Sequence, residues 1–175
     1  MSLPFAGLVV YHEVGDDVLS PGEGTLDGLA IHDQHRQGEM EAMYWLDERG
    51  RTTIVEAPGR DSYRWRNSAS VFTDAVSVVG WVHQVGYRGE SAYDTRATHV
   101  ETLYTGSPES VISTLRRYGV DYIYVGPGER EVFGDITDFE RIDGISVAFE
   151  NEAVTIFAVD HQQLPPVSAP VTGYV

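Results

Sequence analysis

The side chains best suited to chemistry gather between Gly80 and Arg88, in the run Gly-Trp-Val-His-Gln-Val-Gly-Tyr-Arg. An indole ring can stack on a sugar or another apolar ring, and imidazole, amide and guanidinium groups can bind hydroxyls or phosphate. In an extended conformation, Trp81 and His83 would share one face of this segment. Gln84 and Arg88 would lie on the other face. The alternative is a half-buried strand whose histidine and arginine pair with nearby carboxylates.

A second group of polar and aromatic side chains follows a β-branched run. Glu56 stands at the end of this run, where strands of α/β folds often present functional groups. The residues that come next include Arg60, Tyr63, Arg64 and Arg66. In a chain with a formal charge of −15, these three arginines form a local basic patch. The patch can receive an anionic head group, or its arginines can pair with surrounding acids.

The run from Gly126 to Arg130, Gly-Pro-Gly-Glu-Arg, places Glu129 and Arg130 directly after a glycine-rich turn. Such a turn between a strand and a helix can cradle phosphate with its backbone N–H groups. The run has neither the Gly-x-Gly-x-x-Gly spacing of dinucleotide-binding sites nor the lysine of a Walker motif. It therefore favours a simple turn over a phosphate site.

His32 and His35, with Asp33 between them, have the i,i+3 spacing of a metal-binding pair on a helix. No second pair of ligands stands out, and the chain has no cysteine for a zinc–thiolate site. We therefore predict neither a metal site nor a cofactor. The chain also lacks a Gly-x-Ser-x-Gly nucleophile elbow, so no motif assigns catalytic residues.

The composition argues against two classes of partner. The 27 acidic residues outnumber the 12 basic ones, all of which are arginine, and the pI is about 4.6. A nucleic-acid-binding surface needs basic stripes that neutralise phosphates, and an anionic membrane surface attracts basic segments. We therefore expect no nucleic-acid partner and no docking on anionic lipid.

The complete absence of lysine also indicates the kind of solvent to which the protein is adapted. Carboxylates hold water and keep the net charge far from zero, and salt at about 1 M screens self-repulsion within about 3 Å. This composition is typical of a protein adapted to molar salt, as in halophilic archaea. The alternative is an ordinary acidic domain.

Hydrophobic periodicity predicts alternating helices and strands. The clearest unit is a helix that begins after Ser107, a typical N-cap followed by proline, and ends at Gly119. Because a buried strand at 120–125 follows directly, we expect an α/β fold with a mostly parallel or mixed sheet flanked by helices. The other predicted elements are a helix at 38–49, strands at 52–56 and 76–80, and a C-terminal β-hairpin at 145–149 and 153–159.

The length suits a single domain. We predict an N-terminal segment or loop at 1–24, one α/β domain at 25–160 and a flexible, proline-rich tail at 161–175. The apolar run Leu3–Tyr11 is too short to span a membrane and lacks the basic start of a signal peptide. It is either a first core strand or the end of a membrane helix.

Several short motifs occur together in an order that resembles a known family. They are Thr25–Ala30, Tyr44-Trp45-Leu46, Ile54–Gly59 with Tyr63, Gly80-Trp81, His83-Gln84, Arg88, Arg96, Val100, Leu103-Tyr104, Tyr118-Gly119-Val120, Tyr122–Gly126 and Glu129-Arg130. This order resembles the C-terminal extracytoplasmic region of the polytopic archaeal and chloroflexal membrane proteins called the YYY family. The resemblance covers roughly residues 25–159, although the chain has no Tyr-Tyr-Tyr run.

The resemblance implies a location at the extracytoplasmic face of the cell membrane, within a polytopic protein similar to GT-C glycosyltransferases, which use lipid-linked sugar donors. The catalytic acid of such enzymes lies on an early loop that this chain lacks, so the resemblance implies an accessory domain. Its partners would be the membrane-embedded portion of the parent protein and a lipid-linked sugar or glycan acceptor. The positions that match recurrent family residues, and that we expect to bind substrate, are Glu56, Tyr63, Trp81, His83, Gln84, Arg88, Glu129 and Arg130.

Two other functions stay open at the level of the sequence. The chain can be a structural or interaction module, in which the same residues stabilise the fold and the acidic surface keeps it in solution. It can also be a free-standing enzyme that acts on a small molecule, with Glu56 as base and His83 as acid. Turnover of a panel of sugar phosphates by the isolated chain would identify the enzyme.

Adaptation to molar salt predicts how stability depends on ionic strength. Transfer of the chain from molar to dilute potassium chloride should lower its melting temperature, because the repulsion among the excess carboxylates is then no longer screened. Thermal unfolding followed by circular dichroism across a salt series measures this effect. A melting temperature that stays constant or rises on dilution would leave the chain as an ordinary acidic domain.

Overall fold

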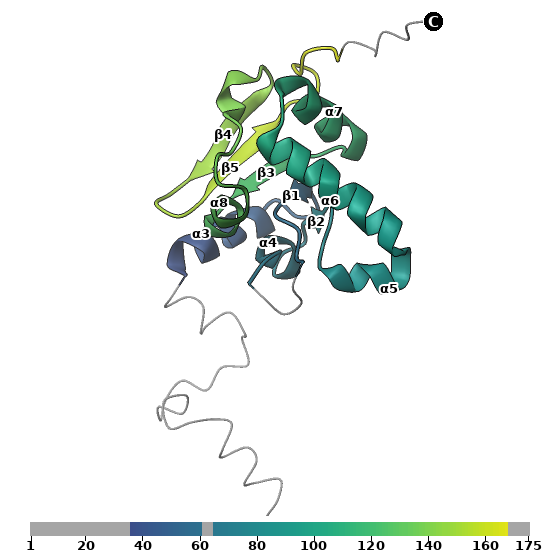
Figure 1. The fold of residues 1–175 in the computed structure, drawn as a ribbon. Helices are drawn as coiled ribbons and strands as arrows, with labels where there is room; N and C mark the ends of the chain where they lie inside the picture. Colours follow the sequence, from purple (N-terminus) through teal and green to yellow (C-terminus); the bar gives the residue numbers. More distant parts are fainter. Residues whose placement is uncertain (1–35, 61–64, 168–175) are drawn as a thin grey trace, which may run out of the picture. The chain divides into compact units, whose positions relative to one another are not determined.

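The computed structural model describes residues 36–60 and 65–167, within which a five-stranded mixed sheet forms the central layer (Figure 1). β1 is parallel to β2 and β3, whereas β5 is antiparallel to β3 and β4. The α/β class, the mixed sheet and the C-terminal hairpin predicted from the sequence are therefore confirmed. In order across the sheet, the strands are β2 (Val76–Ser77), β1 (Thr53–Val55), β3 (Tyr122–Val125), β5 (Thr155–Val159) and β4 (Ile145–Glu150).

Helices precede and connect these strands. The helix expected after Ser107 is confirmed, because Ser107 Oγ accepts a hydrogen bond from Ser110 N and Gly119 ends the helix with a φ of 58°. The sequence pattern does not predict the 16-residue helix α6, in which polar side chains interrupt the apolar periodicity. The helices are α3 (Gln37–Asp47), α4 (Ser68–Val71), α5 (Val85–Arg88), α6 (Glu90–Thr105), α7 (Pro108–Tyr118) and α8 (Pro127–Phe133), with 3₁₀ turns η1 (Val82–Gln84) and η2 (Phe139–Arg141).

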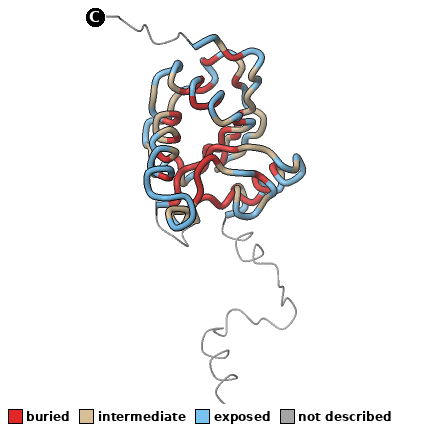
Figure 2. The backbone as a smooth tube through the Cα atoms, turned by 90° about the vertical axis from the view of Figure 1, so that its right-hand side faces the viewer, coloured by how far each residue is buried: buried red, intermediate tan, exposed pale blue. Residues whose placement is uncertain are grey.

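Helices pack on both faces of the sheet, because successive side chains of a strand point in opposite directions. Val55 and Ile123 belong to a core that they share with α6 and α7. Their sequence neighbours Ile54 and Tyr124 belong to a second core, together with α3 and α4. In Figure 2 the buried backbone, in red, runs through the interior, and exposed segments lie outside it. The described residues thus form three layers, with the sheet in the middle.

The three parallel strands end at the same edge of the sheet. The chain leaves β1 at Glu56, β2 at Val78 and β3 at Gly126. In the sheet, β2 lies on one side of β1, and β3, the next strand along the chain, lies on the other side of β1. The strand order therefore reverses between β1 and β3. Open α/β sheets bind ligands beyond the carboxyl ends of their strands at such a point.

Leu164 anchors the start of the predicted C-terminal tail to the core. Leu164 is 4 % exposed and belongs to the core formed by α6 and α7. Its carbonyl oxygen accepts a hydrogen bond from Arg116 Nη2 at 2.8 Å. Leu164 is therefore the one buried residue of the described tail segment 161–167, in which residues 162, 163, 166 and 167 are exposed. The segments 1–24 and 168–175, and the predicted boundary at residue 25, lie outside the described residues.

Tyr104 ties α6 to the ends of two parallel strands, which makes it a test of this framework. Its hydroxyl oxygen lies 2.6 Å from Tyr124 O and 3.0 Å from Val55 O, so its single hydrogen is shared between two carbonyls, and the side chain is fully buried. We expect Tyr104→Phe to lower the free energy of unfolding by about 1 to 3 kcal/mol, because buried carbonyls lose a donor. Denaturant titration measures the loss, with Tyr87→Phe, a tyrosine 91 % exposed, as the matched control. Equal stability of the two variants would contradict this account of Tyr104.

Candidate functional site

A cleft of about 480 Å³ opens beside the edge strand β2. This volume lies within the ~300–1,000 Å³ that is typical of small-molecule sites. Four residues expected from the sequence to bind substrate line the cleft together: Trp81, His83, Gln84 and Arg88. Its lining also includes residues that the sequence did not single out for binding, among them Asn67, Ser70, Ser77, Tyr87 and Arg96.

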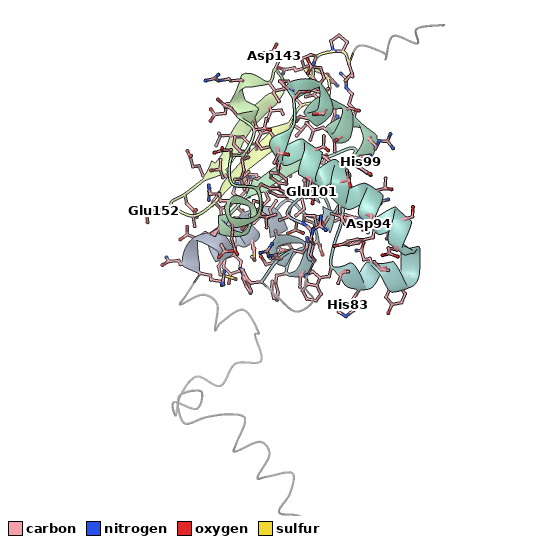
Figure 3. The ribbon with its side chains drawn as sticks, viewed as in Figure 1. His83, Asp94, His99, Glu101, Asp143 and Glu152 are labelled. Atoms are coloured by element: carbon pink, nitrogen blue, oxygen red, sulfur yellow. The ribbon has the colours of Figure 1, made fainter. Side chains whose placement is uncertain are left out.

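The segment 82–88 is helical and not extended. The turn η1 leads directly into α5. Helical spacing of four residues brings Gln84 and Arg88 onto one side of the segment. Trp81 and His83 line the same cleft, and Figure 3 shows His83 at the α5 end of the described structure. The helical turn therefore gathers side chains that an extended chain would divide between two faces.

The indole of Trp81 forms a fixed wall of the cleft. Its Nε1 donates to Arg66 O at 2.7 Å. The backbone at Trp81 forms a parallel bridge with Gly59, where Val82 N donates to Gly59 O at 2.8 Å. A Cβ atom on Gly59 would collide with Trp81 Cδ1, so this close approach requires glycine. The half-buried indole is therefore held in one position within the lining of the cleft.

The cleft differs in charge from the chain as a whole. Arg88, Arg96 and His83 line it, and no acidic residue does so within the described part of a chain that carries 27 acids. Arg96 of α6 donates from Nη1 to Val78 O at 2.9 Å, so the backbone that follows β2 holds its guanidinium at the cleft. The sequence does not indicate this role, because Arg96 lies on a helix that the periodicity does not reveal. Its signals in the sequence were the scarcity of cations and its place in the ordered set of motifs.

Asn67 shapes the polar wall of the cleft. Its φ of 60° is left-handed, a conformation that asparagine adopts more readily than most other residues. Its Nδ2 donates to Ala57 O at 3.0 Å and to Val79 O at 3.2 Å, two carbonyls that follow β1 and β2. Its Oδ1 is buried and has no hydrogen-bond partner within the described structure. One side chain therefore joins the ends of both strands to the cleft.

Glu56 lies behind this wall rather than in the cleft. The side chain is 1 % exposed, and its carboxyl group accepts a hydrogen bond from Ser70 Oγ. Burial raises the pKa of Glu56 to about 7, while the hydrogen bond from Ser70 lowers it and the charge of Glu129 raises it. Glu56 therefore contacts Ser70, which lines the cleft, but does not line the cleft itself.

Glu129 occupies the crevice between β1 and β3. Its Oε1 accepts from Ala57 N at 2.8 Å and its Oε2 from Gly126 N at 2.9 Å. Burial raises the pKa of Glu129, and these two backbone hydrogen bonds lower it. The glycine-rich run that follows β3 leads into α8, and the chain's own carboxylate occupies the position of an anion there. Glu129 is thus part of the framework and not of the cleft.

The remaining predicted cations form contacts of their own. Arg130 donates from Nη1 to a carbonyl of the β4–β5 turn at 2.6 Å. In the basic patch, Arg60 pairs with Glu101, which Figure 3 places on α6, and Arg66 lies 3.5 Å from Glu131. Residues 63 and 64 lie outside the described part of the chain. The described arginines of the patch therefore pair with acids, one of the two possibilities open from the sequence.

Across residues 36–60 and 65–167, no group of three or more histidine, aspartate or glutamate side chains is arranged to hold a metal ion. The pair His32 and His35 lies outside these ranges. Within the same ranges, no helix is both long and apolar enough to cross a membrane. No protein-family model, curated protein or solved structure matches the chain.

The raised pKa of Glu56 predicts a pH-dependent stability. In the unfolded chain this carboxyl group ionises near pH 4.5, but in the folded chain it holds its proton to about pH 7. Between these values the folded state binds more protons, so the contribution of Glu56 to stability falls as pH rises. We expect Glu56→Gln to gain stability over the wild type across this window.

Denaturant titration from pH 4.5 to 8 checks this gain. Glu152→Gln, on the exposed β4–β5 turn, is the matched control and should follow the wild type. Glu129 contributes a pH dependence of stability of the same sign in both proteins. The informative quantity is therefore the difference in the free energy of unfolding between Glu56→Gln and the wild type at each pH. A difference that does not vary with pH would contradict a proton held by Glu56.

Proposed function

We propose that this chain is an accessory extracytoplasmic domain of a GT-C-like membrane glycosyltransferase, and that its cleft helps to bind a lipid-linked sugar or a glycan acceptor. The observation that carries the proposal is the convergence of Trp81, His83, Gln84 and Arg88 on one cleft. The same residues belong to the ordered set of motifs that resembles the YYY family. Their shared location supports a common role in binding.

The chemistry of the cleft suits recognition of a sugar. Trp81 supplies a fixed aromatic face, while the Gln84 amide and the Ser70 hydroxyl can exchange hydrogen bonds with sugar hydroxyl groups. Two of the buried carboxyl groups, those of Glu56 and Glu129, are poorly placed for catalysis on a ligand. Glu56 lies behind Ser70, and Glu129 is bound to backbone N–H groups. The cleft therefore supports binding, with the transfer chemistry in the membrane-embedded portion of the parent protein.

A non-catalytic interaction module is the second candidate, and the rim of the cleft favours it. Tyr87 is 91 % exposed, Val71 49 % and Val76 42 %, and all three line the cleft. Large apolar side chains that gather at an exposed site mark contact surfaces. In this reading the rim contacts the membrane-embedded portion of the parent protein, and the cleft holds no sugar.

Titration of the chain with mannose 1-phosphate, followed by NMR, separates the two candidates. Sugar binding should shift the resonances of the cleft residues. Gln84→Ala and Trp81→Phe should each weaken binding about tenfold, because each removes a contact of about 1 to 1.5 kcal/mol. Gln163→Ala, an exposed glutamine bonded to Asp160, is the control and should bind like the wild type.

The parent membrane protein supplies the second readout. The same two cleft variants should lower glycan transfer by the full-length protein while thermal unfolding of the isolated chain stays close to that of the wild type. Unchanged transfer together with an unchanged NMR spectrum on addition of sugar phosphate would replace the binding role with the interaction module.

A further inference from the structure

Two arginines share the cleft with no acidic residue in its described lining. Arg88 ends α5 and Arg96 lies in α6, and Gly89, with a φ of 84°, turns the chain between the two helices. Both arginines therefore line the same cleft from consecutive helices. In a chain with a formal charge of −15, a recess lined in this way attracts a negatively charged group.

Arg96 is held in place while most of its donors stay unused. Its Nη1 donates to Val78 O at 2.9 Å, and its guanidinium carbon lies 5.3 Å from the centre of the Tyr118 ring. A guanidinium group has five N–H donors. In the described part of the chain, Arg96 forms no other side-chain hydrogen bond. Because its position is set by the protein, a ligand that binds its remaining donors loses little side-chain entropy in doing so.

Arg88 differs from the arginines that lie near the cleft but outside it. Arg60 and Arg66 are neutralised by glutamates from α6 and α8. Arg88 is exposed and forms no ion pair with any residue of the described ranges. Its charge is therefore available to a ligand in the cleft.

We propose that Arg88 and Arg96 form an oxyanion subsite in the cleft, which takes a phosphate, sulfate or carboxylate group carried by a sugar ring. A planar guanidinium binds such a group through two parallel hydrogen bonds. The indole of Trp81 lines the same cleft, and an aromatic side chain can pack against a sugar ring. This inference rests on the proposed function, for which it names the chemical class of the ligand.

Isothermal titration of the chain with three probes tests the subsite at constant ionic strength. The probes are glucose, glucose 6-sulfate and inorganic sulfate, since a sulfate group keeps its charge across the pH range of the folded protein. We expect glucose 6-sulfate to bind at least about tenfold more tightly than glucose, because charge-assisted hydrogen bonds add to the contacts of the ring. Glucose 6-phosphate and glucuronate then compare the phosphate and carboxylate sources of the charge.

Substitution of each arginine assigns the effect. Arg88→Ala and Arg96→Ala should each weaken glucose 6-sulfate binding about tenfold, a larger loss than either variant causes for glucose. Arg141→Ala is the matched control, since this arginine is 85 % exposed and pairs with Asp138 away from the cleft. Arg96→Lys keeps the charge but loses the planar guanidinium that binds an oxyanion through two hydrogen bonds. It should therefore bind glucose 6-sulfate more tightly than Arg96→Ala but less tightly than the wild type. Thermal unfolding of every variant accompanies the titrations, and if Arg96→Ala is unfolded, Arg88→Ala and Arg96→Lys decide the result.

The outcomes separate the subsite from the proposed function. Equal binding of glucose and glucose 6-sulfate overturns the subsite and leaves sugar binding in the cleft intact. Arginine-dependent binding of sulfate, with no gain from the sugar ring, supports the anion subsite and overturns the sugar-binding role. Absence of binding by all probes overturns both.

Discussion

A buried carboxylate, that of Glu129, closes the place in the sheet where a ligand is usually bound. It accepts hydrogen bonds from Ala57 N and Gly126 N, the backbone groups that follow β1 and β3 at the point where the strand order reverses. In other α/β sheets such a crevice is open to ligands. Here the chain's own carboxyl group fills it, and the cleft lies on the other side of β1, beside β2.

The cost of burying Glu129 is offset by contacts that also hold the cleft in shape. Its neighbour Glu56 is equally buried, and burial raises the pKa of both carboxyl groups. Glu129 is stabilised by two backbone N–H groups, and Glu56 by Ser70 from the wall of the cleft. On the opposite face, the Tyr104 hydroxyl binds carbonyls of β1 and β3. A connected polar network of this kind is rigid when its members are satisfied, and it gives the cleft a fixed base.

Local sequence signals predicted those helices and strands whose ends are marked by capping or turn residues. The helix after Ser107, the strand at 120–125 and the C-terminal hairpin are found as expected, because caps, proline and β-branched runs act within a few residues. The segment 82–88 shows the limit of such signals. Its alternating pattern suits a strand, but Val82 and Val85 pack three residues apart on the core formed by α6 and α7, which selects a helical turn. That core is assembled from distant parts of the chain, so local pattern could not reveal it.

The sequence by itself determined the balance of charge, the absence of lysine, the alternation of helices and strands, and the residue types able to bind a ligand. These properties depend only on composition and on spacing along the chain. Only the tertiary structure decided which of the few arginine side chains stay available to a ligand. Arg60 and Arg66 meet glutamates from other elements, whereas Arg88 and Arg96, from two consecutive helices, meet at one cleft. The physical reason is that the partner of a long side chain is set by which layers pack together, and that packing joins residues far apart in the sequence.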